Sequence, residues 1–304
     1  MLIVGVYVDD IILAGKESSI KQVKAALGSA FDIKDLGKLN YFLGIKFERN
    51  SNNSIWIGQP AYIENLLTTL GMQDCKPVKT LVSIGSQLIK ATEQDESVDQ
   101  KQYQSAVGSL MYLAVSTRPD ISYSVGSLAR FNSKPTKEHW IALKRVLRYL
   151  KGTMDLGILY SKAESDSCIG YTDADWAGDQ DDRKSISGYV FLLSGGAISW
   201  KSQKQRCIAL STAEAEYVAM STATQEAIWL QRLIAEITSS KETPILVYED
   251  NQSAIAMARN PQFHGRTKHI DIRHHYIILC QGTDIGRNCN ATVLSYNNII
   301  SLSN

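Results

Sequence analysis

The chain lacks the features that direct a protein into or across a membrane. No apolar stretch reaches the roughly 18 to 20 residues of a membrane-spanning helix, and no signal-peptide pattern opens the sequence. Its five cysteines are odd in number and show no Cys-x-x-Cys spacing, which favours neither a disulfide framework nor a zinc site. We therefore expect a cytoplasmic or nuclear protein with no membrane partner, whose cysteines are buried or unreactive thiols.

An excess of charge of either sign is also missing. The 304 residues contain 32 Lys and Arg against 31 Asp and Glu, giving a formal net charge of +1. This balance disfavours a generic polyanion binder, so any contact with nucleic acid must come from local basic patches. The candidate contacts are Lys201, Lys204, Arg206, Arg266, Lys268 and Arg273. Four histidines lie from His264 to His275, but the basic residues among them favour a phosphate-facing segment over zinc.

Three short acidic segments are present, each at an expected end of a strand or a helix. They are 171–175, 211–217 and 247–252. The run 168–172 predicts a strand that closes at Asp173, and 187–193 and 197–202 predict two more strands of an antiparallel meander. The run 245–248 predicts a further buried strand that leads to Asp250.

A long helix is predicted between these strands. Ser211, followed three residues later by Glu214, is a capping-box pattern, and the helix should run to about Ile237. A strand–helix–strand crossover favours parallel pairing, so Asp173 and Asp250 should emerge at the same edge of the sheet. Glu214 and Glu216 differ by about 200° around the helix, so we assign the cap to Glu214 and the site to Glu216.

Three converging carboxylates repel one another unless divalent cations lie between them, and Mg²⁺ or Mn²⁺ suits such oxygen ligands. Asp173 or Asp250 alone could instead be an ordinary turn residue. We interpret four neighbouring acids as a solvated loop, namely Asp175, Asp179, Asp181 and Asp182. Three tryptophans are assigned to the core, namely Trp176, Trp200 and Trp229.

The stretch from Tyr171 to Arg273 resembles the ribonuclease H domain of copia-type retrotransposon Pol polyproteins. The resemblance rests on Tyr-Thr-Asp-Ala-Asp-Trp-Ala-Gly at 171–178, Ser-Ile-Ser-Gly-Tyr at 185–189, Ile-Ser-Trp-Lys-Ser-Gln-Lys-Gln at 198–205 and the segment 210–217, in unbroken order. It implies two-metal cleavage of the RNA strand of an RNA–DNA hybrid, with Asp173, Glu216 and Asp250 as metal ligands.

The amino-terminal part resembles the reverse transcriptase of the same polyproteins. Tyr7-Val8-Asp9-Asp10, between two apolar runs, predicts a β-hairpin with both acids at its tip. It is similar to the Tyr-x-Asp-Asp box, whose aspartates hold the catalytic metals, although an Asp-Asp pair in a hairpin can also be only a turn. The segment 35–45 and the segments 103–113 and 117–121 are similar to the regions that follow this box.

A helix is predicted within that connecting region. Thr136 should cap a helix from Lys137 to about Leu150 that Gly152 stops. Its apolar stripe consists of Trp140, Leu143, Val146, Leu147 and Leu150. Its basic border, for which a solvated face is weighed against phosphate contact, consists of Lys144, Arg145, Arg148 and Lys151.

The resemblance breaks at both ends. The chain starts just before the Tyr-Val-Asp-Asp box, which predicts no independent DNA synthesis. Family members continue beyond Tyr276 to a Leu-Ala-Asp segment with a fourth carboxylate. Asp271 is a candidate substitute, although its place between His269 and Arg273 favours a structural or hybrid-contacting role, and Asp284 is not assigned to the site. The unmatched tail suggests a reading-frame change or mis-joined exon, and the alternative hypothesis is a catalytically inactive remnant that at most binds nucleic acid.

Together these features predict an α/β protein with a ribonuclease H-like mixed sheet and flanking helices, preceded by a partial α+β reverse transcriptase palm/thumb and a connection region. The expected boundaries are 1–90 for the palm/thumb, 91–165 for the connection, 166–278 for the incomplete ribonuclease H-like domain and 279–304 for the tail. Candidate linkers are 91–102 and 161–167. The expected partners are an RNA–DNA hybrid and the remainder of a Pol polyprotein.

Overall fold

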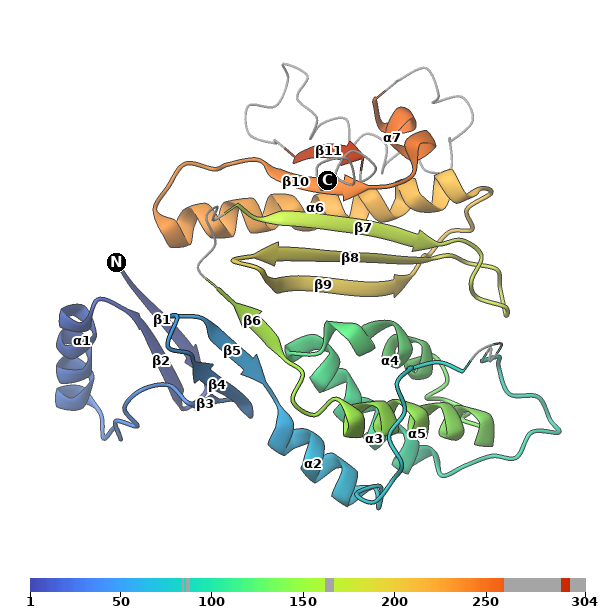
Figure 1. Ribbon diagram of the computed structural model, residues 1–304, viewed down its shortest axis with the longest axis horizontal. Coiled ribbons are helices and arrows are strands. Elements are labelled where there is room, and N and C mark those ends of the chain that lie inside the picture. Colours follow the sequence, from blue (N-terminus) through green and yellow to red (C-terminus); the bar gives the residue numbers. More distant parts are fainter. Residues whose placement is uncertain (84, 86–87, 162–166, 260–290, 296–304) are drawn as a thin grey trace.

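The computed structural model describes residues 1–83, 85, 88–161, 167–259 and 291–295. Its first part holds two small antiparallel sheets (Figure 1). Strands β1 (Leu2–Tyr7) and β2 (Asp10–Gly15) form the predicted hairpin, which helix α1 (Glu17–Ala30) follows. The second sheet has the order β3-β4-β5-β6 and consists of β3 (Tyr41–Phe42), β4 (Ile45–Arg49), β5 (Ile55–Gly58) and β6 (Ile158–Tyr160).

A helical layer lies between β5 and β6 in the chain. It consists of α2 (Pro60–Thr69), α3 (Gln100–Ser116), the 3₁₀ turn η1 (Pro119–Ile121), α4 (Ser122–Ala129) and α5 (Lys137–Gly152). The predicted stripe of α5 is confirmed, because Leu143, Val146, Leu147 and Leu150 are buried in one core with residues of α2, α3 and α4, and Trp140 packs against it.

The α5 helix begins with a capping box that the sequence did not predict in full. The backbone amide of Thr136 donates to Nδ1 of His139, 3.0 Å away, which places a histidine where a glutamate or glutamine usually stands. The basic border of α5 partly serves the chain itself: Arg145 donates to the Thr80 carbonyl and Arg148 to the Lys76 carbonyl. These two arginines therefore hold the loop after α2.

The last part of the chain is a five-stranded mixed sheet with the order β11-β10-β7-β8-β9. Its strands are β7 (Ile169–Asp175), β8 (Ile186–Leu193), β9 (Gly196–Lys204), β10 (Ile245–Glu249) and β11 (Ala291–Ser295). The predicted meander is confirmed, since β7, β8 and β9 pair antiparallel. The predicted crossover is also confirmed, since β10 pairs parallel with β7.

The long helix α6 (Thr212–Thr238) lies along one face of this sheet, and α7 (Gln252–Arg259) follows β10 (Figure 1). Phe191 and Val247 from the sheet pack against Ala223, Ala227 and Leu230 of α6 in a buried cluster. On the side of β9, Nε1 of Trp200 donates to the Ala114 carbonyl of α3 at 2.7 Å. The expected mixed α/β architecture with flanking helices is thus confirmed.

The acidic loop after β7 differs from its prediction. Asp179 is only 2% exposed and forms ion pairs with Arg130 at the end of α4 and with Lys204 at the end of β9. Asp182 also pairs with Lys204, at 2.8 Å, and Asp175 belongs to strand β7 rather than to a loop. The solvated-loop interpretation was wrong for Asp179 because a sequence does not reveal cations that arrive from distant helices and strands.

Two tryptophans assigned to the core are exposed, Trp176 to 46% and Trp229 to 55%, whereas Trp200 is half-buried. The linker expected at 91–102 ends earlier, because α3 already starts at Gln100. Most of the linker at 161–167 lies outside the described residues. Cys75, Cys168 and Cys207 are free thiols, and burial raises the pKa of Cys168 to about 11. Cys280 and Cys289 lie outside the described residues.

Within the described part of the chain, the structure contains no helix with both the length and the apolar character needed to span a bilayer.

Candidate metal centre

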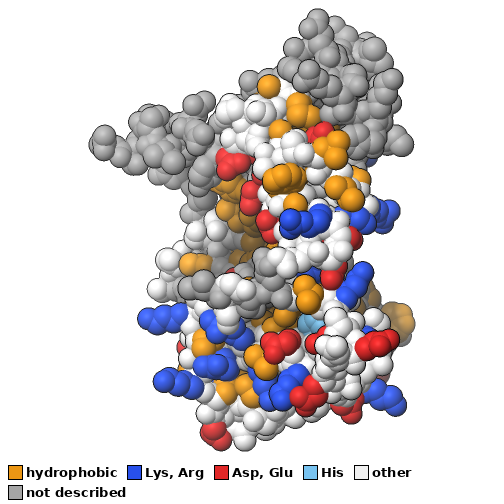
Figure 2. Space-filling model, turned by 90° about the vertical axis from the view of Figure 1, so that its right-hand side faces the viewer, with side chains coloured by type: hydrophobic (Ala, Val, Ile, Leu, Met, Phe, Trp, Pro, Cys, Tyr) orange, Lys and Arg blue, Asp and Glu red, His pale blue; other side chains and the backbone are white. Residues whose placement is uncertain are grey.

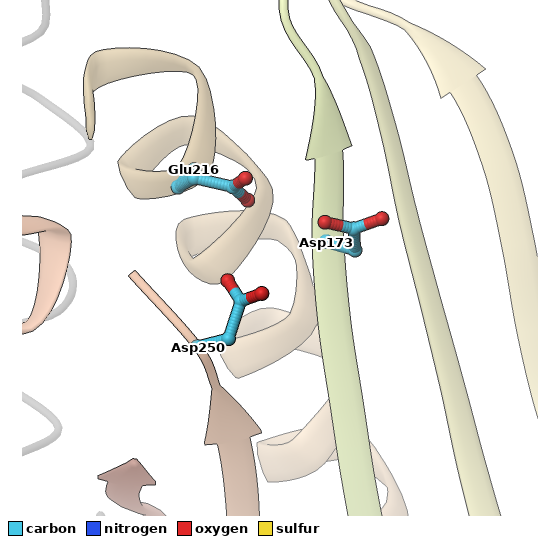
Figure 3. A group of neighbouring side chains, drawn as sticks. All are labelled: Asp173, Glu216 and Asp250. Carbon is cyan, nitrogen blue, oxygen red and sulfur yellow. The ribbon is translucent and has the colours of Figure 1, made fainter. Parts of the chain in front are cut away.

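Three carboxylates from three different elements converge at one end of the five-stranded sheet. Asp173, Glu216 and Asp250 each place an oxygen so that these atoms all lie within 4.8 Å of one another. Figure 3 shows Glu216 reaching from its helix towards the strand of Asp173, with the carboxylate of Asp250 below it. The structure therefore brings together the three acids that the sequence predicted to meet.

The strand pairing explains why the two aspartates reach the same level. Tyr248 of β10 is the register partner of Tyr171 of β7, and each tyrosine precedes an aspartate by two residues. The two tyrosine rings stack with centroids 5.4 Å apart. Asp173 lies within β7, which continues to Asp175, so the prediction that the strand closes at Asp173 was two residues short.

The amino-terminal end of α6 positions the third carboxylate. The Ser211 hydroxyl accepts a hydrogen bond from the Glu214 amide, and the Glu214 carboxylate accepts one from the Leu210 amide at 2.7 Å. Glu214 therefore serves the helix start, as predicted. Glu216, two residues on, turns to the sheet and accepts a hydrogen bond from the Ala174 amide.

The electrostatics of the cluster favour a bound cation. Burial, followed by the charges of Asp173 and Asp250, raises the pKa of Glu216 to about 8. Its Oε2 atom is buried and has no hydrogen-bond partner among the described residues. Buried carboxylate oxygens without partners are costly, and Mg²⁺ and Mn²⁺ prefer such oxygen ligands. The donor set therefore fits a divalent metal ion.

A further acid next to the cluster was missed by the sequence analysis. Glu249, the last residue of β10, is 1% exposed, and burial followed by the charges of Glu216, Asp250 and Asp173 raises its pKa to about 8. Its Oε1 accepts a hydrogen bond from the Asn251 amide at 3.0 Å. The available signal was the alternation of the strand, because Ile245, Val247 and Glu249 share the face that is buried.

Three of the predicted nucleic-acid contacts gather in one place. Lys201, Lys204 and Arg206 line a single cavity of about 320 Å³ between β8, β9 and α6, together with polar residues such as Gln203 and Gln225. Lys204 is also engaged by Asp179 and Asp182. The other three predicted contacts, Arg266, Lys268 and Arg273, lie outside the described residues, as do Asp271, Asp284 and the histidines from His264 to His275.

A second cavity, of about 510 Å³, opens beside Asp173. It lies between the helical layer, represented by Asp120 and Tyr123, and the strand residues Tyr171, Asp175 and Trp200. Asp173 thus lines an open space on one side of the sheet. On the face of the molecule seen in Figure 2, acidic and basic side chains are interspersed, consistent with the balanced net charge.

The hairpin acids occupy a different place and environment. Asp9 lies in the turn between β1 and β2, and Asp10 is the first residue of β2, paired with Tyr7. Both aspartates are exposed. They belong to a separate two-stranded sheet and are not part of the three-carboxylate cluster.

Comparison with known proteins relates the chain to reverse transcriptases and to transposon polyproteins. Residues 1–83 match the family model described as reverse transcriptase (RNA-dependent DNA polymerase). The chain is 45% identical over 284 residues to the retrovirus-related Pol polyprotein from transposon TNT 1-94 of Nicotiana tabacum. The aligned region covers 91% of this chain and 21% of that protein. It is 40% identical over 273 residues to that from transposon RE2 of Arabidopsis thaliana, over 90% of this chain and 18% of that protein.

The chain therefore spans about a fifth of the length of these relatives. Among solved structures, the LC11-RNase H1 isolated from compost matches with a TM-score of 0.28 and 16% identity, over 43% of this chain and 84% of that one.

Proposed function

We propose a function for the carboxylate cluster from one premise: the chain belongs to the Pol polyproteins of copia-type retrotransposons. We infer that residues 166–278 are a ribonuclease H-like domain that cleaves the RNA strand of RNA–DNA hybrids. The convergence of Asp173, Glu216 and Asp250 within 4.8 Å is the observation that carries this proposal.

The proposed site depends on divalent metal, with Mg²⁺ or Mn²⁺ held by Asp173, Glu216 and Asp250. When bound, such ions activate water and stabilise the charge on a leaving 3′ oxygen. The roles of the side chains follow from their environments. The rigid pairing of β7 with β10 fixes the two aspartates relative to each other, and the capped start of α6 fixes Glu216. Pre-positioned ligands of this kind lose little freedom when substrate binds.

The proposed substrate is recognised by shape. Proteins read duplexes that contain RNA mainly through groove width, phosphates and 2′-hydroxyls. Lys201, Lys204 and Arg206, gathered around one cavity, are candidates for the phosphate contacts, with Arg266, Lys268 and Arg273 as further candidates from the sequence. The small net charge favours such local contacts over a general attraction to polyanions.

The amino-terminal region has a separate proposed role. Asp9 and Asp10 lie in the part that matches the reverse transcriptase family, and we propose that they are the metal-binding pair of that polymerase within a larger Pol polyprotein. The boundaries of a partial palm/thumb at 1–90 and a connection at 91–165 are part of the same proposal.

The test is cleavage of an end-labelled RNA strand, presented in an RNA–DNA hybrid and in duplex RNA, by the purified full chain with Mg²⁺ or Mn²⁺. We expect cleavage of the hybrid alone, and loss of it in Asp173→Asn. Glu242→Gln is the matched control, because it removes one carboxylate charge at an exposed position.

Absence of cleavage by a folded wild-type chain would overturn the proposed activity and favour an inactive remnant. Cleavage that persists in Asp173→Asn would show that the activity comes from elsewhere, including a contaminating nuclease.

A further inference from the structure

Gln205, the residue that follows β9, is a buried polar side chain between the sheet and α6. Only 5% of its surface is exposed, and its backbone amide donates to the Ser185 carbonyl at 2.8 Å, which continues the pairing of β9 with β8 by one step. A buried amide side chain is costly unless its polar atoms are bonded. The partners of the Gln205 side chain therefore indicate what its burial achieves.

The side-chain amide of Gln205 joins a strand to a helix. Its Nε2 atom donates to the Ser187 hydroxyl of β8 and to the Ala215 carbonyl of α6, both at 2.9 Å. The Ala215 carbonyl can only accept a hydrogen bond, so Nε2 rather than Oε1 must face it. Oε1 is buried and has no hydrogen-bond partner among the described residues. The donor side of the amide thus links the sheet to the start of the helix.

Both acceptors lie next to residues of the carboxylate cluster. Ala215 directly precedes Glu216 in the first turns of α6. Ser187 is the register partner of Ala174 on β7. Ala174 directly follows Asp173, and its amide donates to Glu216. The glutamine therefore completes a ring of contacts that runs through the strand of one proposed metal ligand and the helix of another.

We propose that Gln205 is a positioning residue that sets the place of Glu216 relative to Asp173. The inference rests on the proposed function of the three-carboxylate cluster. The hydrogen bonds of Ser211 and Glu214 are local to the start of α6, so they shape the helix without attaching it to the sheet. Strand pairing fixes Asp173 but not a residue of the helix. Gln205 supplies a link between the two and needs no contact with metal or substrate to do so.

Mn²⁺ binding to the full chain, measured by electron paramagnetic resonance of free Mn²⁺, tests this role without reference to catalysis. Gln205→Met keeps the length of the side chain and removes both side-chain hydrogen bonds. We expect its dissociation constant for Mn²⁺ to rise by about tenfold or more, because the loss of groups that orient metal ligands has effects of this size. Hybrid cleavage should show a lower kcat with an unchanged KM for the hybrid.

Tyr103→Phe is the matched control. It also removes a buried hydrogen bond, that of the Tyr103 hydroxyl to the Leu128 carbonyl at 2.9 Å, but in the core of the helical layer. It should lower the urea midpoint as Gln205→Met does, while its Mn²⁺ affinity and kcat stay at the wild-type values. An equal loss of Mn²⁺ affinity in both variants would overturn the proposal, because the loss would then follow from general destabilisation.

The other outcomes separate the two levels of inference. An unchanged Mn²⁺ affinity in folded Gln205→Met would overturn the positioning role and leave the three-carboxylate site intact. If only the KM for the hybrid rises, the positioning role is equally overturned, and Gln205 acts as a substrate contact in the cavity that it lines with Lys201 and Arg206. Wild-type chain that binds no Mn²⁺ would overturn the proposed function and this inference with it.

A second variant keeps the test available should Gln205→Met not fold. Gln205→Asn retains the amide but is one methylene group shorter, which withdraws the donor from the Ala215 carbonyl. It should weaken Mn²⁺ binding in the same direction, and wild-type affinity in this folded variant would overturn the positioning role.

Discussion

The acids of the β1–β2 hairpin and those of the five-stranded sheet arise from similar sequence patterns but reach different environments. Asp9 and Asp10 are neighbours in the chain and remain exposed at the turn of a two-stranded sheet. Asp173, Glu216 and Asp250 are spread over 78 residues, yet they come within 4.8 Å of one another. The β7–α6–β10 crossover brings together carboxylates that are far apart in the sequence, whereas the β1–β2 hairpin leaves two neighbouring carboxylates exposed to solvent.

If hybrid cleavage depended on the hairpin acids as well, the two acid sites could not be treated as functionally separate. We expect Asp173→Asn to lower hybrid cleavage by about 10²-fold or more, because it removes a ligand of the charge-stabilising centre. Asp10→Asn should leave the rate unchanged. Single-turnover rates at saturating Mg²⁺ provide the measurement. A loss of similar size in Asp10→Asn would mean that the two acid sites act together.

Asp179 is a buried acid whose charge is balanced by cations of the protein itself, unlike the proposed metal ligands Asp173, Glu216 and Asp250. Asp179, 2% exposed, is held by Arg130 and Lys204. Asp179→Asn should lower the free energy of unfolding by about 2 kcal/mol, since the buried carboxylate is lost to Arg130, whereas Lys204 keeps Asp182 and both cations are partly exposed. Urea denaturation measures the change, and Glu17→Gln, in an exposed pair with Lys21, is the control that should leave the midpoint in place. An unaltered Asp179→Asn midpoint would contradict the inferred role of this ion pair.

In the metal-free chain, removing a carboxylate charge from the metal site should raise the free energy of unfolding, whereas Asp179→Asn lowers it. The pKa of Glu216 is raised to about 8, so at pH 7 the metal-free chain must protonate this group when it folds; Glu216→Gln removes that cost, and we expect it to raise stability in EDTA by about 1 kcal/mol. The same variant should lose the stabilisation that Mg²⁺ gives the wild type, about 2.7 kcal/mol at a metal concentration 100 times the dissociation constant. Thermal melts with and without metal measure both effects, and retained stabilisation in the variant would argue against Glu216 as a ligand.

The smallest expected effect concerns His139, in the first turn of α5. Burial lowers the pKa of His139 below its ordinary value of 6.5, and its Nδ1 accepts the Thr136 amide in the capping box of α5. The unfolded chain therefore binds the proton first as the pH falls, so this contribution to stability is present above about pH 6.5 and is lost below it. The urea midpoint at pH 5.5 should fall less in His139→Gln than in the wild type, relative to pH 7.5. An equal fall of the urea midpoint in the variant and in the wild type would exclude His139 as the cause of the loss of stability at low pH.

The element order around the nuclease-like sheet was predictable from local signals. Apolar, β-branched and aromatic runs joined by Ser194-Gly195-Gly196 marked β8 and β9, and Ser211 with Glu214 marked the start of α6. The crossover rule then brought Asp173 and Asp250 to one edge, and helix geometry selected Glu216 over Glu214. These inferences needed only the chain's own periodicity and handedness.

Only the tertiary structure decided how each acid is surrounded. Asp179 was interpreted as a solvated loop acid, and Glu249 was given no role. The structure buries Asp179 with two cations and buries Glu249 with an unpartnered oxygen among the described residues. Trp176 and Trp229, by contrast, lie exposed. The sequence by itself determined which acids a strand–helix–strand unit brings together, because backbone geometry is local. It could not determine burial and counter-charges, because these depend on side chains that come from elements far apart in the chain.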